Sequence, residues 1–434
     1  MNEPRWSALV SILLVAGAVL AQRLYLQVDT GNDEPAAQTI LPILIALVAA
    51  TTVVISRGRY LKMLLGREFL LIWGLYFGLS VILPILGVAI GHYGFRSLYS
   101  LITPALAVSA LILGATLQAI GWRGLSSLAR PILIAAVAQA AYAVIQQLLV
   151  AHVLPGGPWD LLLQWDAATQ GAFGRGLVFG RSSGFYVNPN ILGVWAGLTM
   201  LAGLAIVEGR SRYVLVGAAL TTLLLSQSRG SAIALAAGLA VLLILARRRG
   251  TVPSLRTLAP YGLVALVVIL GWAFLASLGT PAGSLVGRLG QGIGVLGGGS
   301  DPSVTGRLEF WGSSLHLLLA HPFGTLGPPE TLLGSAVDSE WIRAALQGGP
   351  VYVMGLGLAL IGGAAAYVYD SPERRAVRAC CVFLAVAGLS QLPLEYPPVY
   401  LFWALLGGVL IQRPVRGAVR MTGRFRQGRA SVAT

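Results

Sequence analysis

Apolar segments about 20 residues long recur along almost the whole chain, and this recurrence restricts the possible folds more than any other sequence feature. A helix of about 20 mainly apolar residues can cross the hydrocarbon core of a bilayer. Only 11% of the 434 residues are charged, against about 25% in soluble domains. A soluble enzyme, a disordered chain and a small disulfide scaffold are therefore excluded. We expect an all-α polytopic membrane protein with about 12 transmembrane helices. These are predicted near residues 6–26, 37–56, 69–91, 98–120, 131–151, 190–207, 212–226, 230–246, 259–278, 350–369, 376–394 and 396–412.

Arginine and lysine gather at the two termini and in the connections that follow every second predicted span. Cytoplasmic loops carry an excess of these residues, so both termini are expected in the cytoplasm. Topology and contacts with anionic membrane lipids then account for the formal net charge of +14, and nucleic acid is not expected as a partner. The arginines predicted on the outer side are Arg23, Arg96, Arg175, Arg181, Arg229, Arg288, Arg307 and Arg343.

We expect residues 1–412 to form one transmembrane domain and residues 413–434 to form a basic cytoplasmic tail. Two connections on the outer side are long, at about 152–189 and about 279–349, and long loops are usually functional. In the second one, between the ninth and tenth predicted spans, apolar residues at helical spacing predict short helices, for example across Leu308–Leu319. The functional residues are therefore sought on the outer side.

Two arginines lie at the predicted outer rim of the membrane. Arg181 precedes a helix that begins near Asn190, and Arg229 lies in the turn Ser226–Gly230 between two spans. The guanidinium group is always charged and presents a fork of donors that matches phosphate oxygens. Arginines that converge on one point could hold a lipid-linked diphosphate and stabilise the charge that grows on a departing pyrophosphate. Contact with outer-leaflet lipid phosphates is the alternative for both residues.

Two carboxylates of the second long connection could act on an acceptor. Asp338 and Glu340 lie at the start of a predicted helix, and either could deprotonate a sugar hydroxyl as a general base. Asp338 could instead be the N-cap of that helix. The sequence contains no HExxH and no Cys/His ligand pattern, so no metal or other cofactor is predicted. Further candidate substrate-binding residues are Arg175, Arg307, Arg343, His321, Glu395 and Asn190.

Several of these candidates have structural alternatives. Arg307 could pair with Glu309 or with another carboxylate of the loop, and His321, which precedes a proline, could be a loop or packing residue. Glu395 lies at the outer end of a predicted span, where a charged group without a partner is costly. It could therefore pair with an arginine.

Four motifs follow one another on the predicted outer side. They are Arg-x-x-Gly-Phe with Asn-Pro-Asn at Arg181–Asn190, Ser-Gln-Ser-Arg-Gly at Ser226–Gly230, Gly-Arg…Trp…His-Pro-Phe-Gly-x-x-Gly at Gly306–Gly327, and a polar helix start leading to Gly-Gly at Asp338–Gly349. Their order and the layout of spans around them resemble the O-antigen ligase and O-antigen polymerase superfamily, which are Wzy-type membrane glycosyltransferases of the GT-C type. The resemblance covers roughly residues 180–350.

The resemblance implies a transferase in the bacterial inner membrane, with its active site facing the periplasm. Such enzymes take a glycan from undecaprenyl diphosphate and pass it to an acceptor sugar, and the ligases need no metal. Arg181 and Arg229 would then bind the diphosphate, while the long loop with Arg307 and Asp338 would bind or activate the acceptor. The implied partners are a lipid-linked oligosaccharide, an acceptor that is a second lipid-linked glycan or a lipid A core, membrane lipids and a chain-length regulator.

The start of the fourth motif departs from the usual ligase pattern. Ligases of the superfamily usually have a histidine there, often as His-Asn, whereas this chain has Asp338-Ser339. The polymerases accept an acidic residue more readily, so the resemblance favours polymerisation of lipid-linked polysaccharide repeat units over O-antigen ligation. A lipid-linked oligosaccharide transporter is a further alternative. Transporters often contain two similar halves, but no such repeat is evident and the polar motifs gather on one side of the membrane.

Overall fold

The computed structural model describes residues 3–20, 25–28, 36–120, 124–151, 153–154, 181–186, 188–248, 255–278, 302–334, 337–366 and 371–412. Three expectations concern residues outside these ranges: the role of Arg175, most of the connection at 152–189, and the basic tail at 413–434. The first part of the second long connection, up to residue 301, also lies outside them.

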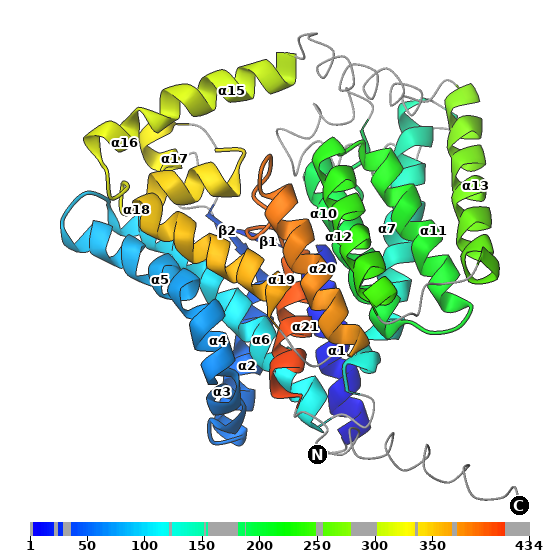
Figure 1. Ribbon diagram of the computed structural model, residues 1–434, viewed down its shortest axis with the longest axis horizontal. Coiled ribbons are helices and arrows are strands. Elements are labelled where there is room, and N and C mark those ends of the chain that lie inside the picture. The colour runs from blue at the N-terminus through cyan, green and yellow to red at the C-terminus, as the bar shows by residue number, and fades with distance from the viewer. Residues whose placement is uncertain are drawn as a thin grey trace, which may run out of the picture.

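Each predicted span is helical over most of its length (Figure 1). The longer apolar stretches form the bundle, and short helices lie between them. The elements are α1 (Glu3–Leu20), β1 (Tyr25–Val28), β2 (Ala36–Thr39), α2 (Ile40–Ile55), α3 (Arg59–Leu64), α4 (Arg67–Ile72), α5 (Gly74–Ala89), η1 (Phe95–Leu101), α6 (Ile102–Ile120), η2 (Gly124–Leu128), α7 (Ala129–Val150), α10 (Pro189–Ile206), α11 (Ser211–Ser226), α12 (Arg229–Arg248), α13 (Leu255–Ser277), α15 (Pro302–Leu315), α16 (Leu317–Ala320), α17 (Glu330–Leu333), α18 (Glu340–Gly357), η4 (Leu358–Gly362), α19 (Gly363–Ala365), α20 (Pro372–Ala387) and α21 (Val399–Ile411).

Within the described ranges, six helices are long and apolar enough to cross a membrane, and five shorter apolar helices accompany them. The chain is therefore a polytopic membrane protein. The remaining predicted span corresponds to α20, which is less apolar because Arg374, Arg375 and Arg378 lie in its first half. The number of crossings, about 12 by sequence, stays a prediction.

The all-α fold class is confirmed, and between α1 and α2 the chain also forms a short hairpin that was not predicted. Strands β1 and β2 pair antiparallel, with Tyr25 opposite Thr39 and Val28 opposite Ala36. Tyrosine, valine and threonine favour extended backbone. Pairing also gives the backbone groups beyond the helix ends hydrogen-bond partners, so the apolar stretch that runs on from α1 leaves the helical conformation.

The buried core lies where α6 packs against α21. Gly114 of α6 faces the backbone of Ala404, and Gly407 of α21 faces the backbone of Leu111. A Cβ atom at either glycine would overlap the facing backbone, so these small residues let the two helices approach closely, as is common between membrane helices. Helices α10 and α20 pack against α21, whereas α13 lies at the edge of the bundle with little of its surface covered (Figure 1).

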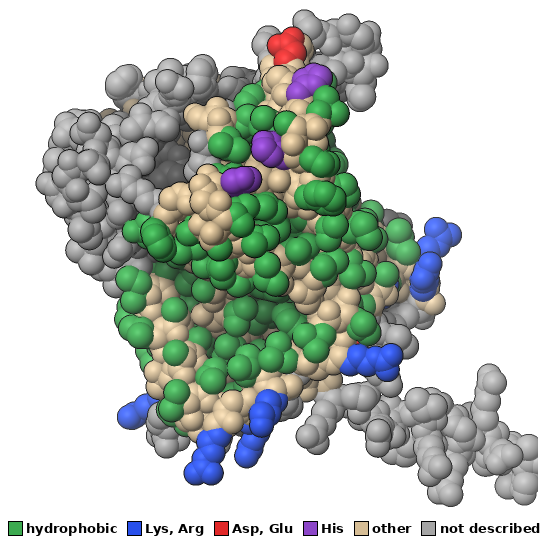
Figure 2. Space-filling view, turned by 90° about the vertical axis from the view of Figure 1, so that its left-hand side faces the viewer, with side chains coloured by type: hydrophobic (Ala, Val, Ile, Leu, Met, Phe, Trp, Pro, Cys, Tyr) green, Lys and Arg blue, Asp and Glu red, His purple; other side chains and the backbone are tan. Residues whose placement is uncertain are grey.

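The two ends of the bundle differ in charge. The end that we call the basic end carries the N-terminus and α3, with Arg57, Arg59 and Lys62, whereas the opposite loop end carries α15, α16 and α17 (Figure 1). Figure 2 shows lysine and arginine side chains around the lower rim, histidines near the upper end, and hydrophobic side chains over the face between them. Such a separation is expected of a protein with one cytoplasmic and one outer face.

Candidate functional site

Residues 181–186, which we call the Arg181 segment, are held against α7 by the amide group of Gln146. Its Oε1 atom accepts hydrogen bonds from the backbone amides of Ser183 and Gly184, at 3.1 and 2.9 Å. Its Nε2 atom donates to the Gly184 carbonyl at 3.2 Å. Gly184 has a φ of +58°, and a side chain there would overlap Gln139, which explains the glycine in this motif.

Two further glutamines of α7 hold the same segment. Gln139 Oε1 accepts from the Phe185 amide at 2.9 Å, and Gln147 Nε2 donates to the Ser182 hydroxyl at 2.9 Å. Gln139 lies seven residues before Gln146 and eight before Gln147, about two helical turns away, so the three side chains lie on one side of α7. All three glutamines are buried. The Ser182 amide also donates to the Leu225 carbonyl of α11 at 2.9 Å, so the backbone of the Arg181 segment is fixed by neutral groups of α7 and α11.

The Arg181 side chain is oriented by two acceptors. Its Nε atom donates to the Ser226 carbonyl at 3.0 Å, and its Nη2 atom donates to Asn190 Oδ1 at 2.6 Å. Asn188 caps α10, with its Oδ1 atom accepting from the Asn190 amide at 2.8 Å. Asn190, a candidate substrate-binding residue, thus positions Arg181; its contact with substrate stays a prediction.

The turn between α11 and α12 carries Arg229 to the same region. Gln227 ends α11 with a φ of +49°, in the left-handed region. Ser226, whose carbonyl accepts from Arg181, lies three residues before Arg229, the first residue of α12. The two arginines that were predicted to act together therefore come from elements joined by a direct hydrogen bond.

Gln391, in the connection between α20 and α21, holds the start of α12. Its Nε2 atom donates to the hydroxyls of Ser228 and Ser231, at 3.1 and 3.2 Å, and these hydroxyls hydrogen-bond each other at 2.9 Å. Gly193 of α10 approaches so closely that a Cβ atom would overlap Ser228. Buried polar groups thus fix the backbone around Arg229, as they do around Arg181.

Asp338 lies just before α18 and pairs with Arg307 of α15. Their Oδ2 and Nε atoms are 3.5 Å apart, and 58% of the Asp338 side chain and 32% of the Arg307 side chain are exposed. The structural alternative for Asp338, that it caps this helix, is wrong. Ser339 is the N-cap, because its Oγ atom accepts from the Ile342 amide at 3.4 Å. The Asp338 carboxylate is therefore exposed beside a guanidinium group.

Glu340, the other carboxylate expected to act as a base, is buried, with 6% of its surface exposed. Its backbone amide donates to the carbonyls of Gly388 and Gln391, at 2.9 and 3.0 Å. These bonds tie the start of α18 to the connection between α20 and α21. In the part of the chain that the structure describes, its Oε2 atom is buried without a hydrogen-bond partner. Glu340 and Asp338 therefore differ sharply in their access to an acceptor.

Arg343, one turn further along α18, pairs with two carboxylates. Its Nε atom lies 2.8 Å from Glu330 Oε1 of α17, and its Nη1 atom contacts Glu395, which precedes α21. The expectation that Glu395 pairs with an arginine is confirmed. Burial raises the pKa of the Glu395 carboxyl, and the Arg343 guanidinium opposes this shift. The three side chains link the long loop to α18 and to the α20–α21 connection.

The motif that contains His321 supplies hydrogen-bond donors to a break in α18. The backbone of Gly348–Gly349 is non-helical, so carbonyls in the preceding turn lose their helical partners. The amides of Thr325 and Leu326 donate to the carbonyls of Leu346 and Gln347, at 2.7 and 2.9 Å. The loop that follows His321 therefore completes the helix at its break.

His321 itself lies beside a second histidine. Its ring centroid is 6.5 Å from that of His92, which follows α5, with the rings nearly perpendicular. Across the described ranges, no group of three or more His, Cys, Asp or Glu side chains is placed to hold a metal ion. A role of His321 in substrate binding stays a prediction.

Residues 214–350 match a family model described as O-antigen ligase. Over these residues the chain is similar to an O-antigen ligase domain. This match confirms the resemblance inferred from the motifs over that range, which includes Arg229, Arg307, Asp338, Glu340 and Arg343. No curated protein matches the chain significantly.

The matched region begins in α11 and ends just past the Gly348–Gly349 break of α18. Arg181, Asn190 and the glutamines of α7 precede it in the sequence. The hydrogen bond from Arg181 to Ser226 joins these residues to the matched region. The candidate site is therefore shared between the matched region and helices α7 and α10.

Sequence reasoning missed the residues that position the arginines. These residues belong to no catalytic motif. The one sequence feature that could have identified them is that they are polar side chains within or next to apolar helices. A polar group is costly to bury unless it is hydrogen-bonded, so the spacing of the glutamines in α7 predicts a polar partner on one face. The missed residues are Gln139, Gln146, Gln147, Gln391 and Glu330.

Proposed function

We propose that the protein transfers a glycan from an undecaprenyl-diphosphate carrier to an acceptor sugar at the periplasmic face of the bacterial inner membrane. The observation that carries this proposal is the hydrogen bond from Arg181 Nε to the Ser226 carbonyl, which joins Arg181 to the turn with Arg229. A guanidinium group held by acceptors keeps its orientation before a ligand arrives, and such preorganised charge stabilises a transition state effectively. Two arginines, one in the segment that precedes α10 and one at the start of α12, suit a diphosphate whose lipid tail stays in the bilayer.

In the proposed reaction, an acceptor hydroxyl oxygen forms a bond to the anomeric carbon of the glycan. The bond between that carbon and the diphosphate oxygen breaks, and the departing undecaprenyl diphosphate keeps the electron pair. Arg181 and Arg229 stabilise the negative charge that develops on this leaving group. The proton of the acceptor hydroxyl passes to a carboxylate that acts as general base.

Asp338 suits the role of base better than Glu340. More than half of the Asp338 side chain is exposed, and the guanidinium group of Arg307 lies beside its carboxylate. Glu340 is buried, and its backbone is tied to the connection before α21. An acceptor that enters from the outer side would therefore meet Asp338 first.

We favour a second lipid-linked repeat unit as the acceptor, which makes the protein a polymerase. The support is the sequence Asp338-Ser339 at the start of α18, where ligases of the superfamily usually have a histidine. A chain-length regulator would then be a partner. The second candidate is an O-antigen ligase that acts on a lipid A core, and the description of the matched family favours it.

Transport of a lipid-linked oligosaccharide has less support. Charged residues near the membrane midplane are typical of transporters. In the described part of the chain, the buried charged side chains are Glu340 and Arg374, and both lie in the first turn of their helices. Charge at helix ends favours chemistry at a membrane surface.

The purified protein in nanodiscs, supplied with the undecaprenyl-diphosphate-linked repeat unit of its own organism, tests the proposal. A ladder of longer lipid-linked chains on a gel is expected of a polymerase. Transfer only after addition of a lipid A core would assign ligase activity instead. Absence of transfer in both assays would contradict the proposed function.

A further inference from the structure

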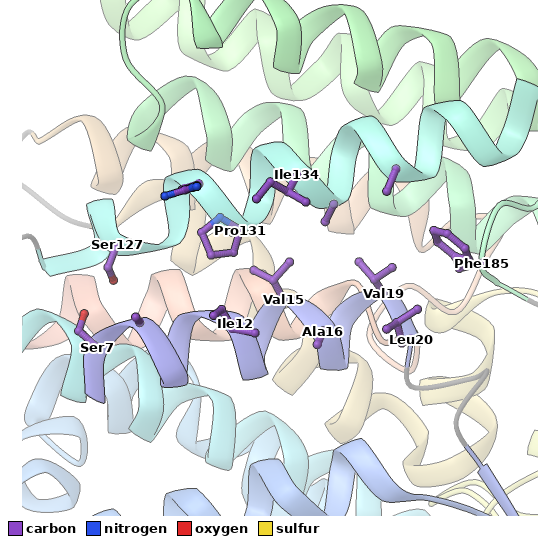
Figure 3. Close-up of a pocket in the computed structure, with 14 residues that line it drawn as sticks. Ser7, Ile12, Val15, Ala16, Val19, Leu20, Ser127, Pro131, Ile134 and Phe185 are labelled. Atoms are coloured by element: carbon purple, nitrogen blue, oxygen red, sulfur yellow. The ribbon is translucent and has the colours of Figure 1, made fainter. Parts of the chain in front are cut away.

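An apolar groove runs between α1 and α7 and has a volume of about 870 Å³. Figure 3 shows the side chains of Val15, Val19 and Pro131 in the space between the two helices, and Ile12 and Ile134 also line the groove. Ala16 and Ala138 also line it, and their small side chains leave room for a ligand. The polar groups of the lining, Ser7, Ser127 and Arg130, lie at the basic end.

The groove is longer than one leaflet of a bilayer is thick. It follows α1 from Ser7 to Leu20, which corresponds to about 20 Å of helix. The hydrocarbon core of a bilayer is about 30 Å thick, so one leaflet contributes about half of that. A single acyl chain from the outer leaflet would therefore leave part of the groove empty, whereas a long polyprenyl chain could follow it throughout.

Hydrogen bonds join the walls of the groove near both of its ends. At the basic end, the hydroxyls of Ser11 in α1 and Ser127 in η2, which leads into α7, are 2.9 Å apart. At the loop end, the Tyr186 hydroxyl donates to the Ala18 carbonyl of α1 at 2.8 Å. The walls are thus held together by the fold, which gives the groove a defined shape.

The loop end of the groove leads directly to the Arg181 segment. Phe185 lines the groove, and its ring stacks on Tyr142 of α7 with centroids 4.7 Å apart. Phe185 and Tyr186 belong to the same segment as Arg181, which the glutamines of α7 hold in place. The segment with the diphosphate-binding arginine therefore also forms the outer end of an apolar groove.

We propose that this groove binds the polyprenyl tail of the lipid-linked donor. The inference rests on the proposed function, because it places the diphosphate at Arg181. The tail would run from Phe185 between α1 and α7 toward Ser127. Since membrane lipid is as apolar as the tail, the groove selects by close packing along its length, not by removing the tail from water. A longer polyprenyl chain fills more of the groove and binds more tightly.

Equilibrium binding to the purified full-length protein in detergent tests this inference, with undecaprenyl diphosphate and geranyl diphosphate as probes. The two probes share the diphosphate and differ in chain length. We expect the protein to prefer the long chain by about tenfold or more, equivalent to about 1.4 kcal/mol. Ala16→Trp and Ala138→Trp, which obstruct the groove, should reduce this preference to about twofold or less while binding of geranyl diphosphate persists. Ile43→Trp, at an exposed position on α2, is the control and should keep the preference.

The ratio of the affinities for undecaprenyl diphosphate and geranyl diphosphate tests the groove, whereas binding of geranyl diphosphate alone tests the diphosphate site of the proposed function. Full preference for the long chain in both obstructed variants would overturn the groove assignment, as would a copurified phospholipid that undecaprenyl diphosphate does not displace from the groove. Unchanged binding of geranyl diphosphate in Arg181→Ala would overturn the diphosphate site instead. If a tryptophan variant no longer binds geranyl diphosphate, the smaller obstructions Ala16→Leu and Ala138→Leu take its place. The measurement is again the affinity for undecaprenyl diphosphate relative to that for geranyl diphosphate. An undiminished preference for the long chain in these variants would also overturn the groove assignment.

Discussion

The Arg181 segment and the long loop are attached to the helix bundle by different kinds of interaction. Neutral groups hold the Arg181 segment, and its main partner, Gln146, is fully buried. The long loop is attached through the largely buried pair of Arg343 with Glu330 and through backbone hydrogen bonds from Thr325 and Leu326 to α18, and it contains the exposed ion pair of Arg307 with Asp338. Buried hydrogen bonds keep their geometry at any ionic strength, whereas exposed ion pairs are weak and screened by salt.

This difference matches the two tasks in the proposed transfer. The donor diphosphate needs fixed charges at the place where negative charge develops, and rigid buried contacts provide them. An acceptor glycan has to enter, react and leave, and weak exposed contacts such as Arg307–Asp338 can open and re-form. We therefore expect the donor side to be preorganised and the acceptor side to be adjustable.

The largest effect is expected from removing the donor-side charge. Arg181→Ala should lower the rate of transfer about 10³-fold, the upper end for one stabilising donor, because its guanidinium is oriented toward the proposed diphosphate site by Ser226 and Asn190. Transfer by purified protein measures the effect. Arg212→Ala is the matched control, since Arg212 also donates from Nε to a carbonyl, that of Val207, but at the other end of α11. Equal activity of the two variants would remove Arg181 from the donor site.

A smaller loss is expected on the acceptor side. Asp338→Asn should lower the rate about 10²-fold, the lower end for a general base. Ser339 caps α18, so a lost cap cannot account for the change, and the melting temperature should stay close to that of the unchanged protein. Glu309→Gln, another carboxylate-to-amide change in the same loop, is the control. If Asp338→Asn transfers at the full rate, the base lies elsewhere.

The positioning role of α7 predicts a moderate effect. Gln146→Leu leaves the amides of Ser183 and Gly184 without their acceptor, and each unpaired buried group costs about 1–3 kcal/mol. We expect lower thermal stability and weaker binding of undecaprenyl diphosphate by the folded protein. Gln118→Leu also removes an acceptor from a backbone amide, that of Leu125, but near the basic end. It should lose stability and keep its affinity, and a parallel loss of affinity would contradict the positioning role.

The smallest effect is expected for the exposed ion pair. Arg307→Gln should change the free energy of unfolding by less than about 1 kcal/mol, because exposed pairs contribute about 0.2–1 kcal/mol. Chemical denaturation in mild detergent, at low and high salt, measures this difference. It should shrink further as salt rises. A change comparable to that of Gln146→Leu would show that the loop is attached as firmly as the Arg181 segment.

The sequence predicted most of the helices but not all of the connections. Long apolar runs and the position of arginines are strong signals, because the bilayer restricts spanning structures to helices of sufficient length. The hairpin of Tyr25–Val28 with Ala36–Thr39 was missed, since short strands carry little periodicity. The break at Gly348–Gly349 matches the predicted start of a span at residue 350, because paired glycines and a proline disfavour a continuous helix.

The candidate site was predicted at its charged residues and not at its supports. Arg181 and Arg229 stood out because charge at the rim of apolar helices needs a partner. Gln146 and Gln391 did not, since only their neighbours in space explain them, and these come from distant parts of the sequence. Asp338 and Glu340 looked alike by sequence but differ in burial, because the carbonyls of Gly388 and Gln391 hold the backbone of Glu340 against the bundle.

The central claim is that the arginines at the loop end hold the donor diphosphate. The most direct test compares glycan transfer from the undecaprenyl-diphosphate-linked repeat unit by three purified proteins: the unchanged protein, Arg229→Ala and Arg212→Ala. Arg229 begins α12 beside the turn that binds Arg181, whereas Arg212 lies at the basic end. A diphosphate held at the loop end predicts product chains from the unchanged protein and from Arg212→Ala, and almost none from Arg229→Ala. Equal product from all three proteins would contradict it.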